Sequence, residues 1–120
     1  MSSADVRQAW MRFRDEVSAR AMENKQSQEA VLALAARYRS LSGEERIVVD
    51  DMLAEQLGSE DETVRFDALA LIADFEIRST VPALRRLADW LESQAWPGAP
   101  YEWAKVNRVI RALTQTRDQE

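Results

Sequence analysis

The apolar positions along the chain recur at helical spacing. Val6, Trp10, Phe13 and Val17 stand at i, i+4, i+7 and i+11, which places their side chains on one face of a helix. The same period continues between the interruptions at "NKQSQ" and "QAWPGAP", and the final "TRDQE" is expected to fray. We expect six helices: one over about Ala4–Asn24, three that begin near Ser27, Ser42 and Ser59, one after "EIRST", and one over about Tyr101–Thr116.

Helix boundaries follow from capping residues. Ser42 with Glu45, and Ser59 with Glu62, have the spacing of a capping box, in which each side chain satisfies a free backbone N–H of the first turn. Gly58 is a typical residue to stop the third helix. Ser2 or Ser3 is expected to cap the first helix, and Ser79 or Thr80 the fifth, with Pro82 in its first turn.

The fourth helix, within Ser59–Ile77, is apolar on two sides. One stripe consists of Val64, Ala68, Leu71 and Phe75, with Ile72 at its edge, and the other of Phe66, Leu69 and Ala73. A helix with two apolar sides packs on both, so we expect it to lie between helical layers. The expected inward positions of the other helices are Val31, Leu34, Tyr38, Val48, Val49, Met52, Leu53, Leu57, Leu84, Leu87, Ala88, Leu91, Trp103, Val106, Ile110 and Leu113.

Part of the chain resembles a known repeat. Asp61, Val64, Arg65, Ala68 and Ile72, followed by Pro82 and Leu84, are similar to the D-x-x-V-R-x-x-A-x-x-x-L … P-x-L pattern of HEAT-type repeats. The resemblance covers about Asp61–Leu91 and implies a short HEAT-like α-solenoid of antiparallel helix pairs. The alternative is an irregular helical bundle with a central fourth helix.

Length and composition favour one all-α domain over residues 1–120. It would comprise an N-terminal helix (1–24), helical pairs (26–94) and a C-terminal helix (101–117). The chain contains no Cys and no apolar run of membrane-spanning length, and its N-terminus lacks the layout of a signal peptide. We therefore expect a soluble, cytoplasmic protein without membrane contact.

Charge is concentrated in the middle of the chain. The net charge is −5, but residues 41–80 alone carry eleven acidic and three basic side chains. Such a segment favours binding of a basic protein, because complementary charge steers association. The acidic candidates are Asp50, Asp51, Glu55, Glu60, Asp61, Asp67 and Asp74.

Catalysis is not expected. The absence of His and Cys excludes the commonest general base, the thiol nucleophile and His/Cys zinc sites. Asp51 with Glu55, and Asp67 with Asp74, leave a Mg²⁺ or Ca²⁺ site as one alternative and a solvated acidic face as the other, which we favour. We therefore expect no enzyme activity, no cofactor and no metal.

Nucleic acid is not expected as a partner either. Lys105, Arg108 and Arg111 share one side of the last helix, opposite its apolar face, and Arg85 and Arg86 lie nearby in sequence. The chain is nevertheless acidic, with a pI of about 4.9, whereas binding to phosphates depends on positive charge.

Aromatic residues gather around the last loop. Trp96 and Tyr101 are candidates for an interface anchor, because large rigid aromatic side chains are favoured at binding hot spots. Alternatively, Trp96 staples the loop onto the fifth helix and Trp103 enters the core. Met11 and Met22 lie off the main stripe of the first helix, which suggests a second covered side or a homodimer contact.

The expected function is a non-enzymatic protein–protein interaction module with an acidic binding surface. One specific form is an immunity or antitoxin-type inhibitor that covers the basic site of a toxin. Another alternative is a self-associating structural subunit.

Overall fold

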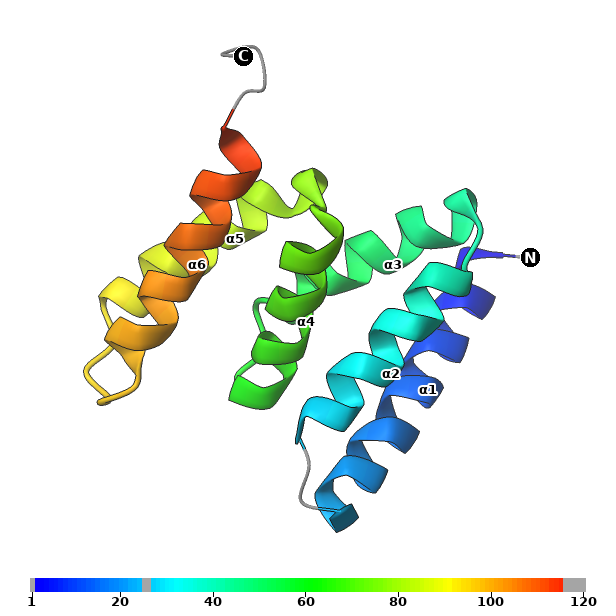
Figure 1. Ribbon diagram of the computed structural model, residues 1–120. Helices are drawn as coiled ribbons and strands as arrows, with labels where there is room; N and C mark the ends of the chain where they lie inside the picture. Colours follow the sequence, from blue (N-terminus) through cyan, green and yellow to red (C-terminus); the bar gives the residue numbers. More distant parts are fainter. Residues whose placement is uncertain (1, 25–26, 116–120) are drawn as a thin grey trace. The chain divides into compact units, whose positions relative to one another are not determined.

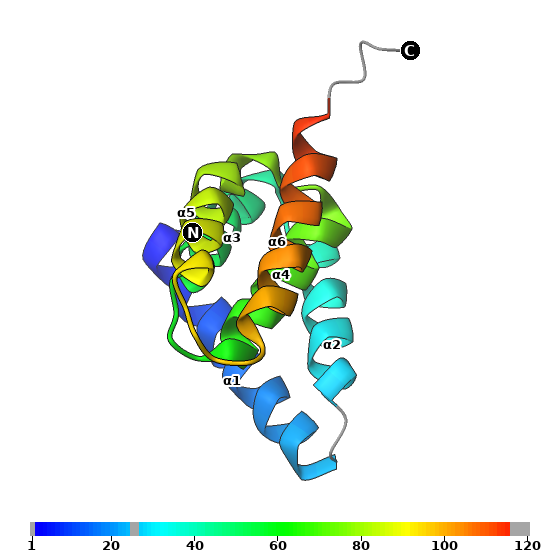
Figure 2. The same ribbon diagram turned by 90° about the vertical axis from the view of Figure 1, so that its left-hand side faces the viewer.

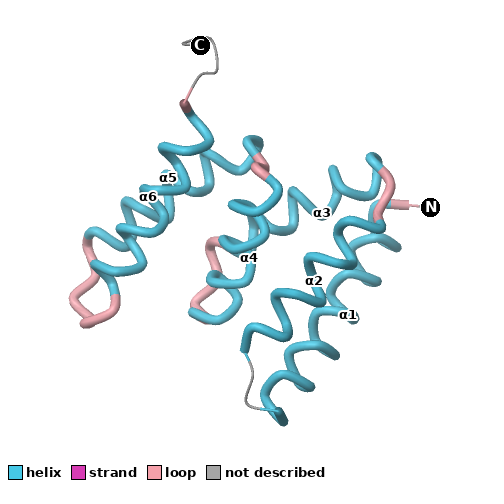
Figure 3. The backbone as a smooth tube through the Cα atoms, in the orientation of Figure 1, coloured by secondary structure: helices cyan, strands magenta, loops and turns pink. Residues whose placement is uncertain are grey.

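The chain folds into helices joined by short connections. The computed structural model describes residues 2–24 and 27–115, and within them there is no strand. The elements are α1 (Ser3–Asn24), α2 (Ser27–Ser40), α3 (Gly43–Gln56), α4 (Glu62–Phe75), the short 3₁₀-helix η1 (Arg78–Thr80), α5 (Val81–Glu92) and α6 (Ala99–Thr114) (Figures 1 and 3). Over these described residues the predicted all-α class with six α-helices is confirmed. Part of the expected break "NKQSQ" and the whole of the tail "TRDQE" lie outside the described residues.

The helices divide into two compact units, residues 1–52 and 53–120, whereas length and composition favour one domain. The first unit contains α1, α2 and most of α3. The second contains the last turn of α3 together with α4, α5 and α6.

In the first unit α1 packs against α2, and the two helices run in opposite directions (Figure 1). Trp10 and Val17 of the predicted stripe are buried, and so are Leu34 and Tyr38 on α2. Met11 and Met22 suggested a second covered side of α1, but they are 40 % and 81 % exposed, so that side is largely open within this unit. The homodimer alternative stays a prediction.

Two reciprocal caps begin helices of this unit. The backbone N–H of Glu45 donates to Ser42 Oγ at 3.2 Å, and the N–H of Ser42 donates to Glu45 Oε1 at 2.8 Å, so the first predicted capping box is confirmed. These bonds hold the pKa of Glu45 below its usual value. At α1 the N–H of Asp5 donates to Ser2 Oγ at 3.2 Å, as expected for a serine cap.

In the second unit α5 packs against α6, and α4 lies beside them (Figures 1 and 2). Helices α4 and α6 run in the same direction and α5 runs in the opposite one (Figure 1). The predicted inward residues Leu84, Leu91 and Val106 are 2 % exposed or less. Full burial of one such side chain stabilises the fold by about 2 kcal/mol.

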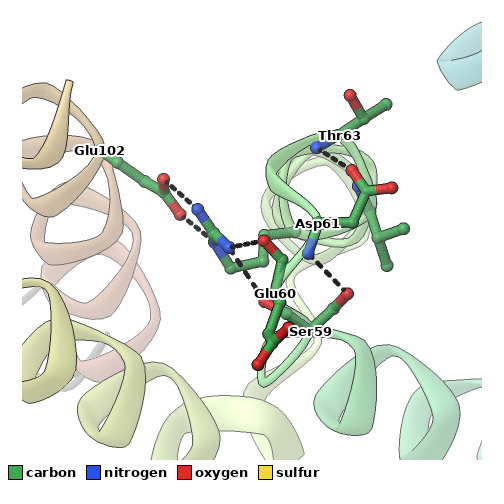
Figure 4. Close-up of polar contacts among 7 residues, drawn as sticks. Ser59, Glu60, Asp61, Thr63 and Glu102 are labelled. Atoms are coloured by element: carbon green, nitrogen blue, oxygen red, sulfur yellow. Dashed lines mark hydrogen bonds and ion pairs between the residues drawn. The ribbon is translucent and has the colours of Figure 1, made fainter. Parts of the chain in front are cut away.

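The second predicted capping box is wrong. Asp61, and not Ser59, caps α4: Asp61 Oδ1 accepts from the N–H groups of Thr63 at 2.8 Å and Val64 at 3.4 Å. Ser59 Oγ instead accepts from the N–H of Asp61 at 3.1 Å (Figure 4). Three polar residues, 59 to 61, follow Gly58 in the sequence. The conformation of the turn after Gly58 decides which of them occupies the N-cap position.

Helix α4 ends at a residue in the left-handed αL conformation, and this residue is Glu76 instead of a glycine. Gly58 follows the end of α3 as expected, yet the described glycines all have negative φ. Glu76, directly after α4, has φ 52° and ψ 54°, and the N–H of Ile77 donates to Ile72 O at 3.1 Å, as in a Schellman turn. Ile72 and Ile77, on either side of this turn, are both buried. Their packing in the core holds Glu76 in the left-handed conformation in spite of its steric cost.

Three expectations about apolar side chains need correction. Phe66, expected to pack against a second layer, is 49 % exposed, with Lys105 Nζ 5.2 Å from its ring centroid. Ala73, on the same side, is also exposed, although Leu69 is buried. Trp103, expected inward, is 38 % exposed.

The starts of α5 and α6 agree in part with the sequence prediction. Pro82 stands in the first turn of α5 and Thr80 occupies its N-cap position, as expected, but the Thr80 hydroxyl donates to Ile77 O at 2.7 Å and makes no hydrogen bond to the helix. Helix α6 begins at Ala99, two residues earlier than expected. No helix in the described part of the chain is long and apolar enough to cross a membrane.

Candidate functional site

Arg65 organises one end of the second unit. Because Asp61 caps α4, the carbonyls of Ser59 and Glu60 stay outside the helix, where Arg65 Nη1 donates to them at 2.9 and 3.1 Å. On its other side the guanidinium donates from Nε and Nη2 to the carboxylate of Glu102 on α6, at 2.7 and 2.9 Å (Figure 4). Arg65 is only 3 % exposed, so this bidentate pair links α4, the preceding turn and α6.

The same guanidinium supports an exposed aromatic residue. Its Cζ lies 5.2 Å from the ring centroid of Trp90 on α5, a cation–π distance. The hydrogen bonds that Arg65 donates to Glu102 hold the pKa of the guanidinium above its usual value, so it stays charged. Trp90 is 42 % exposed, and it is therefore fixed on one side and available to solvent on the other.

A groove of about 510 Å³ lies between Trp90 and the last turn of α3. Leu57 and Leu87, both nearly buried, contribute apolar surface to it, and Ala54 and Ala83 are small enough to leave it open. The volume is within the range of pockets that bind small ligands or a few side chains.

Charged residues line the same groove. Glu55 and Glu60 contribute two carboxylates and Arg86 contributes one guanidinium, and all three residues are exposed. Helix α3 ends here at Gln56, so the partial negative charge of its C-terminus adds to the two carboxylates. This end of the groove is therefore suited to a cation.

The predicted acidic residues have different environments. In the first unit Asp50 accepts a hydrogen bond from the Tyr38 hydroxyl at 2.7 Å and is half-buried, whereas Asp51 is exposed. Burial, followed by the charge of Asp51, raises the pKa of Asp50 in spite of that hydrogen bond. Burial and the same bond raise the pKa of Tyr38. Asp50 is thus bonded within the fold and is a poor candidate for direct contact with a partner.

In the second unit Asp67 is 3 % exposed, which contradicts its assignment to a solvent-facing acidic surface. The sequence does not reveal this burial, because it depends on which helices pack beside α4. Glu55 and Asp74 are exposed, as are Glu60 and Asp61, but only Glu55 and Glu60 line the groove.

The aromatic candidates near the last loop also differ. Tyr101 is 76 % exposed, as an interface residue requires. Trp96 is half-buried, and its ring covers Gly98 so closely that a Cβ there would lie 2.8 Å from it. Trp96 therefore secures its own loop.

The sequence places Arg65 only in the repeat pattern and offers Arg86 only for a nucleic-acid surface that is not expected. Trp90 lies off the main apolar stripe of its helix, so its place in the sequence suits a core residue and an interface anchor equally. A residue at the edge of an apolar stripe carries no signal of which residue on another helix it contacts, so the groove could not be predicted from the sequence.

Among residues 2–24 and 27–115, no three acidic side chains come together in a way that could hold a metal ion. Comparison of the chain with protein-family models, with curated proteins and with solved structures found no match. The candidate site therefore rests on its geometry alone.

Proposed function

We propose that the chain is a non-enzymatic protein-binding module with an acidic surface for a basic partner. The observation that carries this proposal is the exposure of charge in residues 41–80. Eight of the eleven acidic side chains in this segment are exposed, whereas Arg78 is the one exposed basic residue among its three. Complementary charge of this kind mainly raises the rate and selectivity of association.

Exposed aromatic residues support a protein as the partner. Trp90 and Tyr101 offer large apolar surfaces, and tryptophan and tyrosine are enriched at binding hot spots. Trp90 is also held in place by Arg65, so little conformational freedom would be lost on binding.

The proposed architecture is a short HEAT-like solenoid. Asp61 at the cap of α4, buried Arg65 and Pro82 in the first turn of α5 occupy roles that suit the repeat pattern. The parallel course of α4 and α6, with α5 opposite, supports the same proposal (Figure 1). An immunity or antitoxin-type inhibitor of a basic toxin is a narrower form of this function, with the toxin as partner.

Self-association is a second candidate, because large apolar side chains are exposed on the first unit. Met22, Leu32 and Ile47 are between 64 and 81 % exposed. Light scattering over a concentration series tests this candidate: a constant monomer mass up to high concentration would reject it.

Charge reversal tests the main proposal. Asp51→Lys with Asp74→Lys changes two exposed residues of the acidic segment, and Asp15→Lys with Asp89→Lys makes the same change in net charge outside it. Basic proteins that co-purify with the tagged chain are produced separately, and their association rates with each variant are measured at several salt concentrations. We expect the first pair to slow association at least tenfold and the second pair to have a much smaller effect. Equal rates for wild type and the first pair would refute the proposal.

A further inference from the structure

The groove beside Trp90 combines two kinds of surface. Trp90, Leu87 and Leu57 form an apolar part, while Glu55 and Glu60 form an acidic end where α3 terminates. Arg86 brings the only positive charge among the lining residues, so the groove is acidic by one charge.

The position of Arg65 decides which ligand group suits each part. Arg65 already holds the cation position on the Trp90 ring, with Cζ 5.2 Å from the centroid, so the exposed part of this indole is left as apolar surface. An aliphatic side chain of the partner would cover the apolar surface of Trp90 and Leu87. A cation belongs at the other end, near two carboxylates and the C-terminus of α3.

We propose that this groove binds a peptide segment of the partner that carries a lysine or arginine next to a large aliphatic side chain. The aliphatic side chain lies on Trp90 and Leu87, and the basic one reaches Glu55 and Glu60. This inference rests on the proposed protein-binding function and assigns it a site within the second unit.

The test uses a displayed library of ten-residue peptides. A central Leu or Ile is fixed, each neighbouring position is Lys or Arg, and the remaining positions vary; a matched library has Asp or Glu at the neighbouring positions. The full chain is the target at physiological salt. The strongest binders are synthesised and their affinities are measured by fluorescence anisotropy. We expect the basic library alone to yield binders, and exchange of the central Leu or Ile for Ala to weaken them at least tenfold.

Three variants locate the binding. Glu60→Lys reverses a carboxylate at the acidic end, and Ala54→Phe fills the groove without removing a buried contact. Asp89→Lys makes the same charge change as Glu60→Lys at an exposed position of α5 outside the groove. We expect at least a tenfold loss for the first two variants and less than a twofold loss for the third. Thermal unfolding of each variant verifies that it is folded.

The outcomes separate this inference from the function on which it rests. Failure of the basic library to yield binders would refute the proposed peptide site. Binders whose affinity Ala54→Phe leaves unchanged would refute it as well. Peptides weakened equally by Glu60→Lys and Asp89→Lys bind by diffuse charge, which also overturns the groove but leaves an acidic binding surface in place. The association rates of the Asp51 and Asp74 variants test that surface independently.

Discussion

The guanidinium of Arg65 on α4 and the carboxylate of Glu102 on α6 form a two-point ion pair, 37 residues apart in the sequence. The arginine is buried and the glutamate side chain is 16 % exposed. Arg65 also contacts the ring of Trp90, which lines the groove. The ion pair between α4 and α6 therefore helps to fix the position of a groove residue.

Removal of one partner of this pair is expected to destabilise the protein. Glu102→Ala leaves a buried charge with two carbonyl acceptors but no counter-ion, and we expect a loss of about 3 kcal/mol in the free energy of unfolding. Urea denaturation measures this loss. The matched double variant Arg65→Met with Glu102→Leu removes both charges and should recover most of it. A double variant as unstable as the single one would show that the charges themselves stabilise the fold.

The left-handed conformation of Glu76 predicts a stabilising substitution. Glu76→Gly removes the steric cost of a Cβ at φ 52° and should raise the free energy of unfolding by about 1 kcal/mol. Glu76→Ala is the control, because it removes the same carboxylate, which lies 3.3 Å from Arg78, but keeps the Cβ. Glycine no more stable than alanine in urea denaturation would argue against strain at this turn.

The N-cap residue of α4 is Asp61 in the structure, whereas the sequence pattern predicts Ser59. Asp61→Ala removes the acceptor for two backbone N–H groups and should cost about 1 kcal/mol, whereas Asp61→Asn should keep nearly full stability. Thermal unfolding compares these variants with Ser59→Ala. A greater loss for Ser59→Ala than for Asp61→Ala would restore the capping box expected from the sequence.

The environment of Asp50 predicts a dependence of stability on pH. Because burial raises its pKa, the folded chain holds this proton more tightly than the unfolded chain, and ionisation of Asp50 destabilises the fold. Wild type should therefore lose stability relative to Asp50→Asn as the pH rises from about 4, the ordinary pKa of Asp, through the raised pKa. The two proteins should differ by a constant amount below this range.

Melting temperatures between pH 3.5 and pH 7 measure the effect. Asp51→Asn is a graded control, because the charge of Asp51 is one cause of the shift, and this variant should reduce the dependence without abolishing it. A constant difference between wild type and Asp50→Asn over the whole range would contradict the prediction.

Much of the local structure could be predicted from the sequence. The helical period located all six helices, and the spacing of Ser42 and Glu45 located a cap that the structure confirms. These features depend on residues within one or two turns of each other, so neighbours in sequence are enough to specify them.

The candidate site could be predicted only in part. The acidic segment and the exposed Tyr101 follow from composition and position, but Asp67 proved buried and Phe66 half exposed. The groove, the support of Trp90 by Arg65 and the partner of Arg65 all join residues from different helices.

The sequence by itself therefore determined which segments are helical, which of their faces are mainly apolar, and where charge accumulates. Only the tertiary structure decided which polar residues are buried, that Asp61 caps α4, and that Glu76 takes a left-handed conformation. The physical reason is that helix formation is governed by local backbone hydrogen bonds and side-chain period. The burial and pairing of a side chain depend instead on which helix packs against it, and that choice is made by the whole core.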